Sequence, residues 1–139
     1  MIENNSNQIK ALVLDGVAQL NEGEFFTAHE TLETAWHLEK APIRVLYQGL
    51  IQFSVACFHA ERKNWVGARR LLQKARKNLL PSIDTDSMID VPDVLLQIEN
   101  FIEIINKFLV SNVTDQEIVV SPQVKLKSRA DQGFIPGSG

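Results

Sequence analysis

The sequence predicts an all-α fold: a compact helical bundle of about five helices, built from two helical hairpins plus a C-terminal helix. Apolar residues recur at helical spacing in five successive stretches, and short breaks carrying Gly, Asn or Pro separate them. The chain has 139 residues, of which 45% are hydrophobic, and this is enough for one core. We expect the bundle over residues 1–112 and an extended tail over residues 113–139.

Composition narrows the possible partners and the compartment. The net charge of −3 gives no overall attraction to nucleic acid or to an anionic membrane. A lone cysteine, Cys57, excludes an intrachain disulfide framework and suggests a reducing compartment. The chain has no apolar run near the roughly 20 residues of a membrane span, and its first residues lack the features of a signal peptide. We therefore expect a cytoplasmic protein.

The first predicted hairpin follows a frayed polar start at residues 1–7. A helix is predicted over residues 8–21, and the Asn-Glu-Gly break after it leads into a second helix that ends near residue 39. Asn21 and Glu24 have the spacing of a capping box for this second helix.

The third predicted helix, residues 43–62, is apolar almost all round, which is typical of a central helix covered by its neighbours. Its narrow polar stripe consists of Gln48, Gln52 and His59. Two amides and an imidazole suit an interior or a pocket wall as well as they suit a solvated face, and both interpretations stay open.

The fourth predicted helix, residues 64–80, is strongly basic. Seven basic residues and no acidic ones lie between Arg62 and Lys77, whereas the second helix region holds five glutamates. Such a run is either a phosphate-binding surface or, more often, a solvated face offset by an acidic neighbour. It lacks the interleaved aromatics of a single-strand binder, so nucleic acid is not the partner we expect.

The fifth predicted helix begins near Pro92, which suits a first turn, and runs to residue 112. Short extended pieces are predicted at residues 117–120 and 124–127, followed by a loose tail over residues 133–139. If the fifth helix leaves apolar surface uncovered, we expect a homodimer.

The chemically capable side chains gather in the stretch GEFFTAHETLETAW, residues 23–36. On a helix, His29 projects from an apolar stripe between Phe25 and Trp36, and Glu33 lies one turn further on, within reach of the imidazole. Either the pair is a structural hydrogen bond that holds two helices in register, or it supplies two metal ligands or a base with its orienting acid.

An internal repeat bears on this choice. A shift of 40 residues aligns the packing positions of the two hairpins, Phe25 with Trp65 and Leu32 with Leu72. The polar residues of the first hairpin are not repeated in the second. His29, Glu30 and Glu33 align with Arg69, Arg70 and Gln73. This asymmetry favours a functional role as much as a structural one.

Familiar catalytic templates fail, since Glu33 stands where the zinc-protease motif has its second histidine. The site that can be built takes His29, Glu33 and His59 as metal ligands, with Glu30 either as the catalytic base or as a group that supports the ligands. Three such ligands with an open position can hold a divalent metal, Zn, Fe or Mn, and activate water. The alternative is a non-catalytic helical binding or assembly module, whose partner is a small molecule or a protein.

The run NEGEFFTAHETLETAW, followed by YQGLIQFSVACFHAERKNWVGARRLL, resembles the domain-of-unknown-function family 309 over roughly residues 17–80. The resemblance implies a compact all-helical bundle, and such proteins have been catalogued as predicted metal-dependent hydrolases. The positions that match the motif are Phe26, His29, Glu30, Glu33, Trp36, Gln48, Gly49 and Gln52. The chain departs from the pattern before Asn64, where the family commonly has a glycine, and this affects only the turn.

Overall fold

A computed structural model describes residues 2–111 and 118–127. In this part of the chain, five α-helices and one short 3-10 turn follow one another, which confirms the all-α prediction. The elements are α1 (Ile2–Asn21), α2 (Phe25–Leu38), α3 (Arg44–Glu61), α4 (Trp65–Leu79), η1 (Leu80–Ser82) and α5 (Val91–Ser111).

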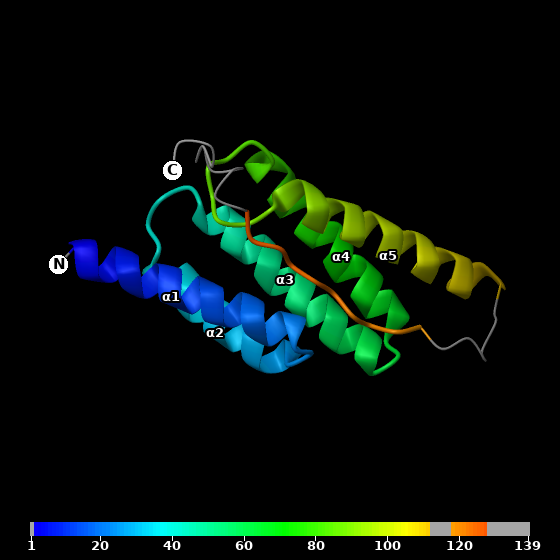
Figure 1. Cartoon of the computed structure of the whole chain (residues 1–139). Coiled ribbons are helices and arrows are strands. Elements are labelled where there is room, and N and C mark those ends of the chain that lie inside the picture. The colour runs from blue at the N-terminus through cyan, green and yellow to red at the C-terminus, as the bar shows by residue number, and fades with distance from the viewer. Residues whose placement is uncertain (1, 112–117, 128–139) are drawn as a thin grey trace, which may run out of the picture.

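The helices form two hairpins that lie side by side, with a fifth helix on one flank (Figure 1). Helix α1 packs on α2, α3 packs on α4, and α2 packs on α3, so the two hairpins meet through α2 and α3. Helix α5 lies against α4. The main neighbours of the basic helix α4 are therefore α3 and α5, rather than the acidic helix α2.

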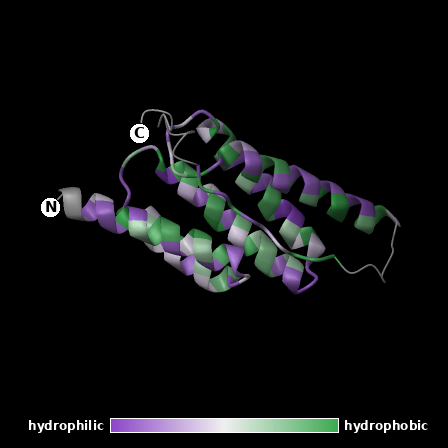
Figure 2. Ribbon diagram, viewed as in Figure 1, coloured by the Kyte–Doolittle hydropathy of each residue, from purple (hydrophilic) through white to green (hydrophobic). Residues whose placement is uncertain are grey.

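The core runs along α3, as its apolar sequence predicts. Leu46, Leu50 and Phe53 are almost completely buried, and the buried Ser54 hydroxyl donates to the Leu50 carbonyl at 3.0 Å. Hydrophobic and hydrophilic bands alternate along α5 in Figure 2, as expected of a helix with one buried face. Helices α3 and α4 approach closely at Gly49, because glycine has no side chain. A Cβ atom at this position would lie 2.6 Å from Leu79 Cγ of α4.

Two predictions about helix ends are wrong. Helix α1 begins at Ile2, earlier than the predicted residue 8. The capping box is absent, because Glu24 stands at the N-cap of α2 without a side-chain hydrogen bond. The Asn21 side chain instead donates to the Val124 carbonyl at 2.9 Å and accepts from the Val124 amide at 2.7 Å.

Residues 118–127, which we call the strap, run along α3 between α1 and α5 (Figure 1). The Gln97 side chain of α5 donates to the Gln123 carbonyl and accepts from the Gln123 amide. Val124 is 3% exposed and belongs to the core, so the strap packs on the bundle. Residue 117 and the predicted loose tail at residues 133–139 lie outside the described residues.

None of the helices in the described part of the chain has both the length and the apolar character needed to cross a membrane.

Candidate functional site

The first two predicted site residues, His29 and Glu33, are in contact on α2. His29 Nε2 lies 3.2 Å from Glu33 Oε2, and His29 Nδ1 lies 3.2 Å from the Phe26 carbonyl oxygen. The side chains of His29 and Glu33 are 22% and 48% exposed. The pair therefore lies at the surface edge of the apolar stripe and reaches solvent.

Both nitrogens of the His29 ring face hydrogen-bond acceptors. A neutral imidazole carries one N–H and can satisfy only one of them, whereas an imidazolium donates to both. The carbonyl contact fixes a proton on Nδ1, and this leaves Nε2 to the Glu33 carboxylate. The arrangement suits either an ion pair or a metal-ligating histidine, whose second nitrogen is usually held by a carbonyl or a carboxylate.

A small hollow separates α2 from α3, and we call it the α2–α3 hollow. It measures about 150 Å³ and its lining is almost wholly apolar. The residues that line it are Phe25, Phe26, His29, Val55, Phe58 and His59. The two imidazoles that the sequence suggested as metal ligands thus border the same hollow, one from each helix.

Aromatic rings surround the α2–α3 hollow. Phe26 is 54% exposed, and its ring centroid lies 5.3 Å from the His29 ring and 5.7 Å from the Phe58 ring. The Arg62 guanidinium carbon stacks 4.6 Å above the Phe58 ring. Sequence reasoning missed Phe58 and Arg62, although their spacing of four residues on one helix face was a usable signal.

The other predicted site residues lie away from the α2–α3 hollow. Gln52 Oε1 accepts a hydrogen bond from Asn78 of α4 at 2.7 Å, and half-buried Gln48 lies one turn earlier on α3. Trp36 is covered by Arg44, whose guanidinium carbon lies 4.1 Å from the ring centroid. Glu30 is exposed and is not part of the lining.

The described residues do not form a three-ligand metal site. They contain no group of three or more His, Cys, Asp or Glu side chains that could hold a metal ion. The bonding of His59 gives a further reason, because the Asn64 side-chain amide donates to His59 Nδ1 at 3.3 Å. That bond places the proton on Nε2, which opposes metal binding at either nitrogen.

The single thiol offers no alternative chemistry. Cys57 is completely buried on α3, and burial together with the Glu61 charge raises the pKa of the thiol far above its ordinary value. A buried, protonated thiol is not a nucleophile at neutral pH.

Residues 13–71 match the model of a family described as a domain of unknown function (DUF309). We call these residues, which make up less than half of the chain, the DUF309 segment. The match confirms the resemblance suggested by the sequence motifs, and the description of the family names no activity. No curated protein and no solved structure matches the chain.

The α2–α3 hollow lies wholly within the DUF309 segment, since all the residues that line it fall between residues 13 and 71. Helix α5 and the strap lie outside this segment. The DUF309 segment therefore contains α2, α3 and parts of α1 and α4, together with the aromatic and imidazole groups between α2 and α3.

Proposed function

We propose that this chain is a non-catalytic assembly module, in which the α2–α3 hollow docks against the same hollow of a second copy. The observation that carries the proposal is the position of Phe26, a half-exposed ring directly beside an apolar hollow. A projection and a recess on one patch are self-complementary under two-fold symmetry, because each copy can insert its ring into the recess of the other.

The side chains of the patch support a docking role. Aromatic residues and arginine are enriched at the centres of protein interfaces and carry much of their binding energy. Here Phe26 and Phe58 are in contact, and Arg62 stacks on Phe58. A patch formed by one hollow and the few side chains around it corresponds to the small end of specific interfaces, so we expect a weak dimer with micromolar affinity.

Charge across the patch fits the same symmetry. The exposed glutamates Glu30 and Glu33 lie on α2. The exposed residues Glu61, Arg62 and Lys63 lie at the C-terminal end of α3 and carry a net positive charge. A two-fold axis between these groups would bring the acidic end of one copy to the basic end of the other. Complementary charges of this kind fix the register of an interface.

In this proposal the His29–Glu33 pair has a structural role. His29 is bonded to the Phe26 carbonyl and its ring packs against the Phe26 ring, so the pair holds the projecting side chain in place. We also propose a cytoplasmic location, which is supported by the single, buried cysteine.

Sedimentation velocity over a range of protein concentrations tests the proposal. We expect the wild-type chain to form a dimer that dissociates on dilution. Phe26→Ser should weaken the dimer at least about 30-fold, the effect of losing an interface residue worth about 2 kcal/mol. Leu96→Ser is the matched control, because Leu96 is 56% exposed on α5, across the bundle. A wild-type chain that stays monomeric, or a dimer equally weakened by both changes, contradicts the proposal.

A second candidate is a metal-dependent hydrolase, and the bonding of His29 favours it. The Phe26 carbonyl holds Nδ1, as a carbonyl often does for a metal-ligating histidine, and Nε2 and the Glu33 carboxylate lie close enough to bind one ion. Since one chain supplies only two ligands here, this candidate requires a second copy to contribute its own His29 and Glu33. Such a site would place one divalent ion between two chains, and hydrolysis would require a further open position on the ion for water.

Metal analysis of the purified protein tests this second candidate. It predicts about one Zn, Fe or Mn ion for every two chains, since four ligands come from two copies. His29→Ala should abolish metal binding while the helical circular dichroism spectrum is kept. Metal-free protein, or metal retained in His29→Ala, would reject the candidate and leave the assembly proposal untouched.

A further inference from the structure

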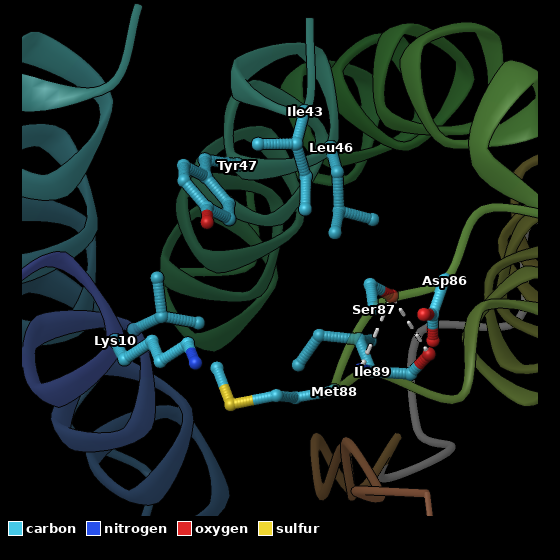
Figure 3. A pocket seen from close by; sticks show the side chains of 9 residues that line it. Lys10, Ile43, Leu46, Tyr47, Asp86, Ser87, Met88 and Ile89 are labelled. Atoms are coloured by element: carbon cyan, nitrogen blue, oxygen red, sulfur yellow. Dashed lines mark hydrogen bonds between the residues drawn. The ribbon is translucent and has the colours of Figure 1, made fainter. Parts of the chain in front are cut away.

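A second cavity lies on another side of the bundle, between α1, the first turns of α3 and the loop before α5 (Figure 3). It measures about 250 Å³. Its lining is slightly more apolar than polar, and the apolar part includes Val13, Leu46 and Ile89, which are almost completely buried. Lys10 belongs to α1 but lies outside the DUF309 match, so the family segment alone does not complete this cavity.

Two hydrogen-bond donors border the cavity without a partner. Within the described part of the chain, neither the Tyr47 hydroxyl nor the Lys10 ammonium group makes a hydrogen bond or an ion pair. In Figure 3 both groups point into the open space between α1 and α3. The Tyr47 side chain is buried apart from its hydroxyl, which keeps some access to solvent and is therefore a group that a ligand in the cavity can reach.

The protonation states of these two groups suit an anionic ligand. Burial, reinforced by the charge of Glu39, raises the pKa of Tyr47 to about 12. The phenol is neutral near pH 7, as an ordinary tyrosine is, and can donate to a ligand. The Glu39 charge that acts on Tyr47 opposes an anion there, so the attraction comes from the ammonium group of Lys10.

The acidic part of the cavity lies at its far side. Asp86 and Ser87 come from the loop, away from Lys10 and Tyr47 in Figure 3. The Ser87 hydroxyl is already engaged, because it donates to the Ile89 carbonyl and accepts from the Ile89 amide, each at 3.3 Å. The side-chain donors at one end are thus unengaged, whereas the loop residues that line the cavity offer no unengaged side-chain donor.

The loop that closes the cavity is held by the strap. The Asp90 amide donates to the Lys125 carbonyl at 2.9 Å, and the Lys127 amide donates to the Met88 carbonyl at 2.8 Å. Ile89 and Leu126 form an antiparallel bridge. The wall formed by Met88 and Ile89 is therefore a paired backbone segment, which gives the cavity a defined shape.

We infer that this cavity binds a small alkyl carboxylate, with its carboxylate between Lys10 and Tyr47 and its chain against the apolar wall. Ligand sites are typically apolar cavities with a few converging polar groups. The volume is below the roughly 300–1,000 Å³ of sites for drug-sized ligands, so the ligand is a short-chain acid. An ammonium and a hydroxyl are both donors, and a carboxylate accepts from both.

Titration of the full chain with hexanoate, followed by amide NMR shifts, tests the inference. We expect saturable binding with shifts at Lys10, Tyr47 and Met88, and an affinity that rises about fourfold per methylene from butanoate to hexanoate. Tyr47→Phe removes only the hydroxyl, and Lys10→Met keeps the stem of an exposed side chain while removing its charge. Each should weaken hexanoate binding about tenfold or more.

Two controls keep the result unambiguous. Lys74→Met changes an exposed lysine on α4 and should leave hexanoate binding as in the wild type. Hexylamine, tested on the wild-type protein alone, should bind at least tenfold more weakly than hexanoate. Absence of saturable hexanoate binding, equal binding of hexylamine, or insensitivity to both cavity variants would overturn the inference. None of these outcomes bears on dimer formation through the α2–α3 hollow.

Discussion

At the level of single residues, the exposure of the His29–Glu33 pair decides what the pair contributes to stability. Helical i,i+4 pairs that reach solvent contribute about 0.3–0.5 kcal/mol. Glu33 is 48% exposed, so its carboxylate keeps most of its hydration in the folded state. A fully buried pair would contribute several times more, because loss of one partner would leave a desolvated polar group without a hydrogen bond.

We therefore predict that Glu33→Gln lowers the free energy of unfolding by no more than about 0.5 kcal/mol in urea denaturation. Glu103→Gln is a matched control, since Glu103 forms an exposed i,i+4 pair with Lys107 at 3.4 Å. The two changes should have similar effects. A loss of about 2 kcal/mol for Glu33→Gln alone would mean that the pair is buried in solution.

The contact between His29 and Glu33 could be predicted from sequence because it depends only on helical spacing. The exposure of His29 could not be predicted from sequence, because it depends on how closely α3 approaches α2. The lack of a three-ligand group among the described residues has a similar cause. His59 is bonded to Asn64, a residue of the following turn, and helical spacing gave no indication of that contact.

At the level of the helices, the close approach of α3 to α4 depends on Gly49. A Cβ atom there would lie 2.6 Å from Leu79 Cγ, and Leu79 is completely buried and has little room to move. Overpacking of this kind costs about 1–3 kcal/mol, whereas replacing glycine by alanine inside a helix gains up to about 1 kcal/mol.

We predict that Gly49→Ala lowers the free energy of unfolding by about 1 kcal/mol, because the steric cost exceeds the gain in helix propensity. Thermal and urea denaturation measure the change. Ala18→Gly, at an exposed position of α1, reports the propensity effect alone in the same protein. A Gly49→Ala variant more stable than the wild type would show that α3 and α4 can separate at little cost.

Helix positions were largely predictable because apolar periodicity is a local property of the sequence. The position of the strap was less predictable, since its contacts join distant parts of the chain. Asn21 and Val124 are separated by 103 residues, and no local pattern links them. The same long-range contact explains the wrong capping box, because the Asn21 side chain bonds to the strap rather than to the first turn of α2.

At the level of the whole molecule, the α2–α3 hollow and the cavity beside Tyr47 are distinct surfaces of one bundle. The hollow involves α2 and the C-terminal half of α3, whereas the cavity involves α1, the N-terminal turns of α3 and the loop before α5. Helix α3 contributes to both and is the central helix of the fold. Assembly through the hollow therefore leaves the cavity beside Tyr47 open to a ligand.

The most direct test of the assembly proposal is the distance between spin labels on two copies. Cys57 is buried, so Thr27→Cys on α2 and Asn100→Cys on α5 each supply one reactive label site. Electron spin resonance at a concentration that favours the dimer should give a short intermolecular distance for the α2 label and a longer one for the α5 label. No coupling from the α2 label, or a shorter distance from the α5 label, would contradict docking through the α2–α3 hollow.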